Sequence, residues 1–327
     1  MHERNASRSS LPKLQRRARQ LSRRGFLQAA TAAAPLIACR RTAAAPAGYG
    51  QRSELEAAVA VTRLHASLTT AQQGVIAFPF DDARRTRVDA NWSVTSPEIG
   101  DDFFTTEQRW LIDQALRGLL SEDAYERTLR QMSDDWGGLS EYNIALFGDP
   151  ASQCQWQITG RHVTLRAWGG TGGTGLGGPI IYGHGIGEPR RSLFFHHTQE
   201  ANRIFSALSS SQRTRALLDD APDEDEVAVQ GEAGKFSGLP ARDLTAEQRA
   251  LLDGLLGTLC ASFRGPTATA IRTQLDLAGG TSALHLAFYK DDDLNDDGLW
   301  DIWRLEGPNF VWHFRGAPHV HAYVNLG

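Results

Sequence analysis

Two histidines near the C-terminus, His319 and His321, have the spacing that points most directly to chemistry. The segment 320–324 alternates in the manner of a strand, and alternate residues of a strand project from the same face, so the two imidazoles would lie side by side. His162, in the alternating segment 162–168, is a candidate third ligand. Three imidazoles, or two with a carboxylate, suit zinc, copper or non-haem iron. The sequence therefore predicts a transition-metal site built from His162, His319 and His321.

Other arrangements of these residues stay open. Further candidates beside His162 come from the intervening segment, which offers His184, His196, His197 and Glu200, and a fourth ligand stays unknown. A His-x-His pair is also short enough to occur by chance. The competing interpretation is that the histidines lie on a solvated sheet face or form hydrogen bonds in the core.

A second metal pattern lies in the acidic segment 293–304. It matches the opening of a calcium loop, with the turn glycine Gly298 at the sixth position and oxygen ligands at Asp293, Asn295, Asp297 and Asp301. The twelfth position is Arg304 instead of the bidentate carboxylate of an EF-hand. Two alternatives remain: a calcium turn that borrows a distant carboxylate, and an acidic hairpin turn.

No nucleophile motif accompanies these candidates. The sequence lacks a Gly-x-Ser-x-Gly elbow, and nothing marks Cys154 or Cys260 as a nucleophile. In an oxidising compartment these two cysteines could form one disulfide. The acidic run 219–226 is expected to be a solvated loop. We assign no catalytic residue from the sequence.

The first 39 residues have the pattern of an export signal. Basic residues dominate the first 24 positions, and a short apolar run, residues 26–39, follows them. That run is too short to span a bilayer, which needs about 20 residues. The consecutive arginines of Ser22-Arg23-Arg24-Gly25-Phe26-Leu27 are typical of signals for the twin-arginine export machinery.

The predicted signal ends in a lipobox-like sequence, Leu36-Ile37-Ala38-Cys39, so we expect lipidation of Cys39 and a membrane anchor. Cleavage within the Ala-rich stretch 43–47 is the alternative. A tether at residues 40–50 and one large domain at residues 51–327 would follow. The predicted location is the periplasm or the cell surface.

The charge of the exported chain argues against nucleic acid as a partner. Loss of residues 1–38 removes eight basic residues and one acidic residue, so the formal net charge changes from −4 to −11. Phosphate binding needs clustered cations.

Two kinds of pattern predict the elements that must position these residues. Short alternating segments rich in aromatic or β-branched residues indicate strands at 142–147, 156–158, 162–168, 284–289, 300–305, 310–314 and 320–324. Helical periodicity occurs at 53–68, 110–120 and 251–263. Strands in two clusters with helices before and between them predict an α+β fold, an antiparallel sheet that carries packed helices in a single large domain.

Four Ser/Thr-x-x-Gln sequences mark helix starts as capping boxes. They are Thr69 to Gln72, Thr105 to Gln108, Ser209 to Gln212 and Thr245 to Gln248. Their recurrence raises the question of an internal duplication. The residues around the boxes do not otherwise align, so we expect only recurrent capping.

From about Leu68 onwards the chain resembles the domain of unknown function 3500 family. The matching stretches are FPFDDARR (78–85), FFTTEQRWLIDQALRGLLSEDAYERTLRQM (103–132), YNIALFGDP (142–150), WQITGRHVTL (156–165), LTAEQRALLDGLL (244–256), RLEGPNFVW (304–312) and HVH (319–321). His162 and the His319 pair lie at matching positions. The chain departs from the family at Arg161, near Trp312, and at Tyr323-Val324-Asn325. The resemblance implies a domain but no chemistry.

The sequence leaves two classes of function open. A catalytic metal centre would make the protein an oxidoreductase or a hydrolase with a metal-bound water. The alternative is a non-enzymatic surface lipoprotein that binds a small ligand or protein through exposed Trp300, Trp303 and Trp312, although alternating aromatic residues are also typical of a sheet core. Convergence of the three histidines would favour the metal centre.

Overall fold

The computed structural model describes residues 56–171, 175–291, 293–294 and 297–327. The predicted export signal at 1–39, its Cys39 and the tether at 40–50 lie outside these residues. The described residues belong to one compact unit. None of the helices in the described part is both long and apolar enough to cross a lipid bilayer.

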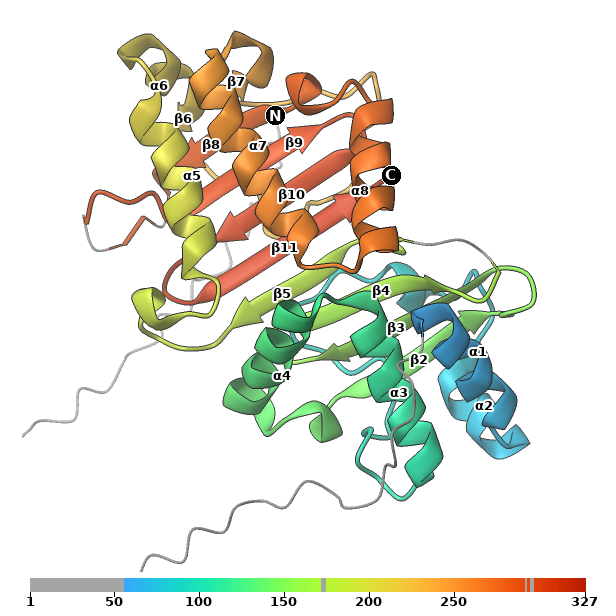
Figure 1. The fold of residues 1–327 in the computed structure, drawn as a ribbon. Helices are drawn as coiled ribbons and strands as arrows, with labels where there is room; N and C mark the ends of the chain where they lie inside the picture. Colours follow the sequence, from blue (N-terminus) through green and yellow to red (C-terminus); the bar gives the residue numbers. More distant parts are fainter. Residues whose placement is uncertain (1–55, 172–174, 292, 295–296) are drawn as a thin grey trace, which may run out of the picture. The chain divides into compact units, whose positions relative to one another are not determined.

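The described residues form eight α-helices and an 11-stranded sheet, which confirms the α+β prediction (Figure 1). The helices are α1 (Ala57–Ser67), α2 (Thr70–Ile76), α3 (Thr106–Leu119), α4 (Glu122–Trp136), α5 (Phe195–Ala207), α6 (Ser210–Ala216), α7 (Ala246–Ala261) and α8 (Gly265–Leu277). Short 3-10 helices lie at η1 (Ala83–Thr86), η2 (Leu139–Glu141), η3 (Pro189–Arg191), η4 (Ala241–Asp243) and η5 (Thr281–Ala283).

The strands are β1 (Ala77–Phe78), β2 (Asn143–Gly148), β3 (Cys154–Gly160), β4 (Val163–Gly169), β5 (Ile180–His184), β6 (Leu217–Leu218), β7 (Leu239–Pro240), β8 (His285–Tyr289), β9 (Ile302–Gly307), β10 (Phe310–Arg315) and β11 (Val320–Leu326). Their order is β1-β2-β3-β4-β5-β11-β10-β9-β8-β6, with β7 beside β8. Pairing is antiparallel except for the two-residue strands β1 and β6, which run parallel to β2 and β8.

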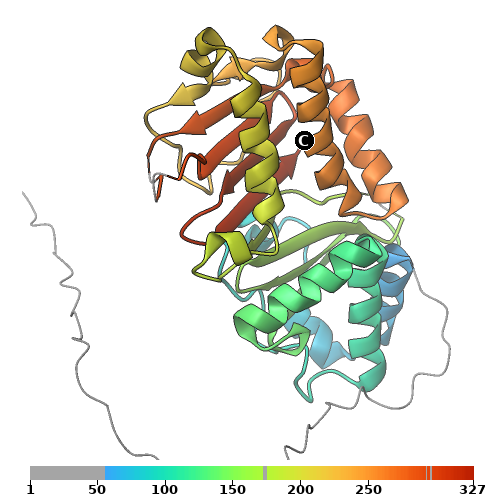
Figure 2. The same ribbon diagram turned by 60° about the vertical axis from the view of Figure 1, so that its left-hand side comes forward.

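The two faces of the sheet are covered differently. Helices pack on one face and share the main apolar core with alternate strand residues such as Trp312 and Val324 (Figures 1 and 2). Loop residues cover the other face: Ala90 and Val227 pack against Val311 and Tyr323. We call these the helix face and the loop face.

All four capping boxes form as predicted. In the box of α3, Thr105 N–H donates to Gln108 Oε1 at 2.9 Å, and Gln108 N–H donates to Thr105 Oγ1 at 3.2 Å. The boxes of α2, α6 and α7 are closed in the same way. Each satisfies two amide groups that a helix start otherwise leaves free.

The boxes do act as recurrent caps, but the expectation that they reflect no internal duplication is wrong, because their glutamines form two matching pairs. Gln72 Nε2 donates to Gln108 Oε1 at 2.9 Å, and Gln212 Nε2 donates to Gln248 Oε1 at 2.9 Å. The remaining hydrogen bonds also correspond: Gln108 reaches Ser67 O, and Gln248 reaches Ala207 O. Every member of the second set lies 140 residues after its counterpart in the first. The chain therefore contains the same helical arrangement twice.

The flanking residues do align once this offset is applied. Residues 105–113 and 245–253 are identical at six of nine positions: Thr, Glu, Gln, Arg, Leu and Asp. The strand order is symmetric about the β5–β11 pair. The hairpin β3–β4 corresponds to β9–β10, so that Trp156, Gly160 and Gly169 match Trp303, Gly307 and Gly316. The fold is an internal duplication of helices followed by a meander, residues 57–184 and 195–326.

The structure corrects several details of the sequence predictions. The seven expected strands form within two residues of their predicted ends, but β5 was missed because Gly183 interrupts its short pattern. Trp303 and Trp312 are fully buried and Trp300 packs against the same core, so these tryptophans do not form the exposed binding surface of the alternative interpretation. Cys154 and Cys260 are both free and buried, and the disulfide that the sequence allowed is not formed.

Buried histidine should make the fold sensitive to acid. Burial, together with the nearby Arg304 guanidinium, lowers the pKa of His313 from 6.5 to about 3. Between these pH values the unfolded chain binds a proton that the folded chain does not, so stability falls as the pH falls through this range. His313→Phe keeps a ring but removes the proton. We measure the free energy of unfolding in urea from pH 7 to pH 4. Its slope against pH should be smaller in His313→Phe than in the wild type, by up to about 1.4 kcal/mol per pH unit. His65→Phe is the control, and equal slopes for both variants and the wild type would contradict the assignment.

Candidate metal centre

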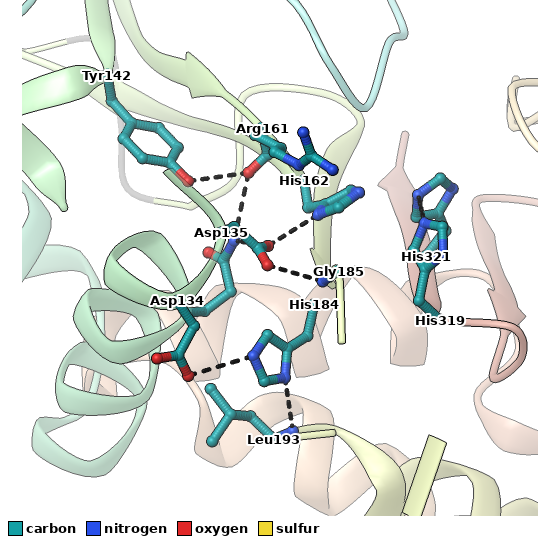
Figure 3. A network of polar contacts seen from close by, with 11 residues as sticks. Asp134, Asp135, Tyr142, Arg161, His162, His184, Gly185, Leu193, His319 and His321 are labelled. Carbon is teal, nitrogen blue, oxygen red and sulfur yellow. Dashed lines mark hydrogen bonds and ion pairs between the residues drawn. The ribbon is translucent and has the colours of Figure 1, made fainter. Parts of the chain in front are cut away.

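His162, His319 and His321 meet at one place, as the sequence predicted (Figure 3). One nitrogen of each ring lies within 4.8 Å of the others. The Nε2 atoms of His319 and His321 are 3.0 Å apart. The ring of His162 has its centroid 5.1 Å from that of His319 and 5.0 Å from that of His321. This group could hold a metal ion.

The register of three strands brings the rings together. Gly183 of β5 pairs with His321 of β11, and the neighbouring Tyr182 pairs with Val163, which follows His162. Gly183 therefore lies between the two histidines on the loop face. A Cβ atom there would be 3.2 Å from His162 Cβ, which is tighter than ordinary packing. Glycine at this position leaves the space in which the imidazoles meet.

His162 was predicted within a strand, but it lies in the two-residue turn between β3 and β4. Its backbone has a φ of 57°, and it is the one described non-glycine residue with positive φ. Left-handed backbone costs an L-residue roughly 1–2 kcal/mol, and such outliers concentrate at functional sites. The backbone N–H of His162 donates to Ala90 O at 2.7 Å, which helps to hold the turn.

Asp135 near the end of α4 orients the His162 ring. Its Oδ2 accepts from His162 Nδ1 at 2.8 Å, and its Oδ1 accepts from the Gly185 amide at 2.8 Å. Burial by itself raises the pKa of Asp135, but the hydrogen bonds from His162, Gln131 and Gly185 outweigh it and lower the pKa. An ionised carboxylate only accepts, so Nδ1 carries the proton and the Nε2 lone pair of His162 is free.

Glu224 orients the His321 ring in the same way. Its Oε2 accepts from His321 Nδ1 at 2.8 Å and from Tyr323 OH at 3.1 Å, and its Oε1 accepts from Arg315 at 2.8 Å. Burial raises the pKa of Glu224, yet the His321 hydrogen bond and the Arg315 charge bring it down to about 2. Glu224 lies in the acidic run that was expected to be solvated, and this member of the run is instead half-buried.

The imidazoles of His319 and His321 are neutral near pH 7. Burial and the neighbouring His321 lower the pKa of His319 to about 4. Burial also lowers that of His321, although the Glu224 hydrogen bond opposes it. Neutral imidazole is the form that binds metal ions.

The further candidate ligands lie outside the three-histidine group. His184 Nδ1 accepts from Leu193 N–H at 3.1 Å, and its Nε2 faces Asp134 at 3.4 Å (Figure 3). His196, His197 and Glu200 belong to α5 on the helix face, and none of them joins the three-histidine group. They do not supply a fourth ligand in this arrangement.

The proposed calcium residues stay a prediction. Asn295 lies outside the described residues. Asp293 Oδ1 accepts from Asp301 N–H at 3.2 Å, Asp301 Oδ2 from Leu294 N–H at 2.8 Å, and Asp297 Oδ1 from Leu299 N–H at 3.0 Å. Such bonds are typical of acidic turns. Burial and the nearby aspartates raise the pKa of Asp301 to about 6, against the Leu294 hydrogen bond.

Two residues of the site, Asp135 and Glu224, were not found from the sequence. Asp135 is one of two adjacent aspartates on a polar helix, and Glu224 is one acid among several in a loop. Neither has a spacing signal, because each meets its histidine only through the tertiary fold.

A sequence profile of the family described as "Protein of unknown function (DUF3500)" matches residues 51–324. No curated protein and no solved structure shows significant similarity to the chain.

Gly185 should control the position of the His162 ring. A Cβ atom at this residue would lie 2.8 Å from His162 Cε1 and 3.0 Å from Asp135 Oδ1, whereas at Gly187, two residues further on, it would meet nothing within 4 Å. We expect Gly185→Ala to shift the His162 imidazole NMR signals and to destabilise the fold by about 1–3 kcal/mol. Gly187→Ala should do neither. Identical spectra for the two variants would show that Gly185 does not constrain the ring.

Proposed function

The chain belongs to the DUF3500 family of proteins of unknown function, and from the geometry of its histidine centre we propose that it is a metal-dependent hydrolase. The observation that carries the proposal is the convergence of His162, His319 and His321, with two of the three rings oriented by carboxylates. Metal-binding histidines commonly donate their second nitrogen to a carboxylate, which fixes the tautomer and the direction of the ring.

The distances support a tetrahedral centre. Zinc–imidazole bonds of about 2.0–2.1 Å place the nitrogen atoms of two ligands roughly 3.3 Å apart. The Nε2 atoms of His319 and His321 are already 3.0 Å apart, and the group spans no more than 4.8 Å. A movement of about 1.5 Å by one ring would reduce a separation of 4.8 Å to the roughly 3.3 Å between two zinc-bound nitrogens.

The types of ligand favour zinc over non-haem iron and over copper(I). Three imidazoles with an open position are the donor set of a catalytic zinc site. Non-haem iron favours two histidines and a carboxylate ligand, whereas Asp135 and Glu224 bind the far side of the rings. Copper(I) favours thiolate or thioether sulfur, and the two described cysteines are free and buried in the core.

A bound ion of this kind would supply Lewis acidity and lower the pKa of a water ligand towards 7. The protein's own part is to keep the imidazoles neutral and aimed, and to leave one side open. His162 is buried, whereas His319 and His321 are half-buried at the outer side of the group. A closed set of four protein ligands would support a structural role instead.

The proposal includes export. The twin-arginine signal and Cys39 would anchor the domain in the periplasm or at the cell surface, and the export machinery moves folded proteins, so that metal could be bound before export. A binding lipoprotein without catalysis is the alternative. Burial of Trp303 and Trp312 removes the aromatic surface on which that alternative was based.

We predict one equivalent of transition metal in the full chain purified without added metal or chelator. The variant His319→Ala/His321→Ala should lose it, because one imidazole does not hold the ion. Elemental determination by mass spectrometry is the measurement. The control His65→Ala/His285→Ala removes the same number of imidazoles away from the centre and should keep its metal.

Each outcome of the metal determination decides between named alternatives. Zinc in the wild type supports the hydrolase. Copper or iron would replace it with an oxidoreductase at the same centre, and absence of metal from wild type and variant alike would refute the metal centre.

Two carboxylates should tune the affinity without binding the ion. Asp135→Asn and Glu224→Gln keep the shape but remove the charge that holds the Nδ1 proton, so we expect 10- to 100-fold weaker metal binding, roughly the usual effect of losing such a partner. Competition with a chromogenic chelator measures it. Asp134→Asn is the matched control, because the neighbouring Asp134 faces His184 instead. Equal affinities for Asp134→Asn and Asp135→Asn would contradict the role given to Asp135.

A further inference from the structure

The three histidines of the metal centre are not held equally by their second ring nitrogen. His162 Nδ1 donates to Asp135 and His321 Nδ1 donates to Glu224, each at 2.8 Å. In the part of the chain that the structure describes, the polar contact of the His319 ring is with His321, Nε2 to Nε2 at 3.0 Å, and its Nδ1 meets no carboxylate. Two rings are therefore anchored from behind, and the third is not.

The backbone shows the same difference between the two neighbouring histidines. His321 lies within β11, where it pairs with Gly183 of β5 on one side and Arg315 of β10 on the other. His319 precedes Val320, the first residue of β11, and takes part in neither ladder as described. The ring of His319 is half-buried. It can therefore turn without disturbing the sheet.

The hydrogen bonds around Glu224 decide which nitrogen donates in the His319–His321 contact. Glu224 accepts from His321 Nδ1, from Tyr323 OH and from Arg315, so it acts as an ionised carboxylate. A neutral imidazole carries one N–H, which in His321 is the Nδ1–H that Glu224 holds. His321 Nε2 is then a lone pair, and His319 Nε2–H is the donor at 3.0 Å.

This N–H···N bond and a metal ion exclude each other, because both use the lone pair of His321 Nε2. For His319 to bind the ion through Nε2, that atom must give its proton to water while Nδ1 takes one up, so the charge of the ring does not change. The described structure holds no acceptor bond at His319 Nδ1 that this change would break. The same change in His162 or His321 would break a bond to its carboxylate.

We propose that His319 is the exchangeable ligand of the centre. In the absence of a metal ion it closes the site by donating to His321. With the ion bound it is the imidazole that gives up its place to a further donor, such as an oxygen of a substrate, while His162 and His321 keep the ion. The second statement rests on the proposed metal centre, whereas the first does not.

NMR of the full chain with ¹⁵N-labelled histidine tests the hydrogen bond. Metal is removed with a chelator, the pH is 8, above the ordinary histidine pKa of about 6.5, and the ring signals are assigned with single His→Ala variants. We expect His321 to be protonated at Nδ1, His319 at Nε2, and a ¹⁵N–¹⁵N coupling between the two Nε2 atoms. One equivalent of zinc should abolish the coupling. Protonation of His319 at Nδ1 before zinc is added, or absence of the coupling, would overturn the proposal.

Exchange is tested with acetohydroxamate, whose oxygen atoms bind zinc, on the zinc-loaded protein. We expect the ring signals of His319 to change to those of an unbound imidazole, while those of His162 and His321 stay in the bound position. Retention of all three rings, or release of His162 or His321 in place of His319, would show that His319 is not the exchangeable ligand.

The zinc affinities of two single variants give an independent measurement by competition with a chromogenic chelator. His319→Ala and His321→Ala each remove one imidazole, so they are matched. The second also removes a ring that Glu224 orients, whereas the first removes the N–H that competes for His321. We expect zinc to bind about 10- to 100-fold more weakly to His321→Ala than to His319→Ala, the usual effect of an orienting carboxylate. Equal affinities, or the reverse order, would contradict the unequal roles.

Failure of this inference differs from failure of the proposed function. If the metal centre itself is wrong, the wild type binds no zinc, whatever the coupling between His319 and His321 shows. If only the role of His319 is wrong, the wild type binds zinc and the two single variants bind it equally.

Discussion

The pairing of β5 with β11 is the constraint on which the rest of the structure depends. It joins the two halves of the duplicated chain into one sheet. It also sets Gly183 opposite His321 and beside the turn of His162, so that imidazoles from distant parts of the chain meet over a residue without a side chain. A shift of this register by one residue would turn His321 to the helix face, because side chains alternate along a strand. The histidine centre therefore depends on the joining of the halves as much as on its ligands.

The duplication separates what the fold needs from what one half has added. The place of His162 in the first hairpin is taken by Asn309 in the second, which donates to the Gln274 carbonyl of α8. The Gln–Gln pairs between capping boxes occur in both halves and hold helix starts together. The histidine trio occurs once. Function is thus added to a repeated frame by side chains, and the frame alone does not identify it.

The sequence predicted the parts of this arrangement that local rules determine. A capping box is a motif of four neighbouring residues that marks the start of a helix. The alternation of strands such as 310–314 is also visible without tertiary context. The pair His319 and His321 was predicted from its spacing and His162 from its alternating segment, although His162 lies in a strained turn and not in a strand. Asp135 and Glu224 were missed because only the fold brings them to their histidines. The duplication was missed although residues 105–113 and 245–253 are identical at six of nine positions, because the boxes were not compared at the 140-residue offset that the glutamine pairs reveal.

Each half contributes what the other lacks at the centre. The first supplies His162, its orienting Asp135 and the space at Gly183, whereas the second supplies His319, His321 and Glu224. One imidazole with its carboxylate would bind a metal ion weakly, and a pair of imidazoles leaves the ion more open than a hydrolytic centre requires. The three imidazole nitrogens come together only because the sheet is continuous across β5 and β11. The three-histidine group therefore requires both halves of the duplicated sheet, joined at β5 and β11.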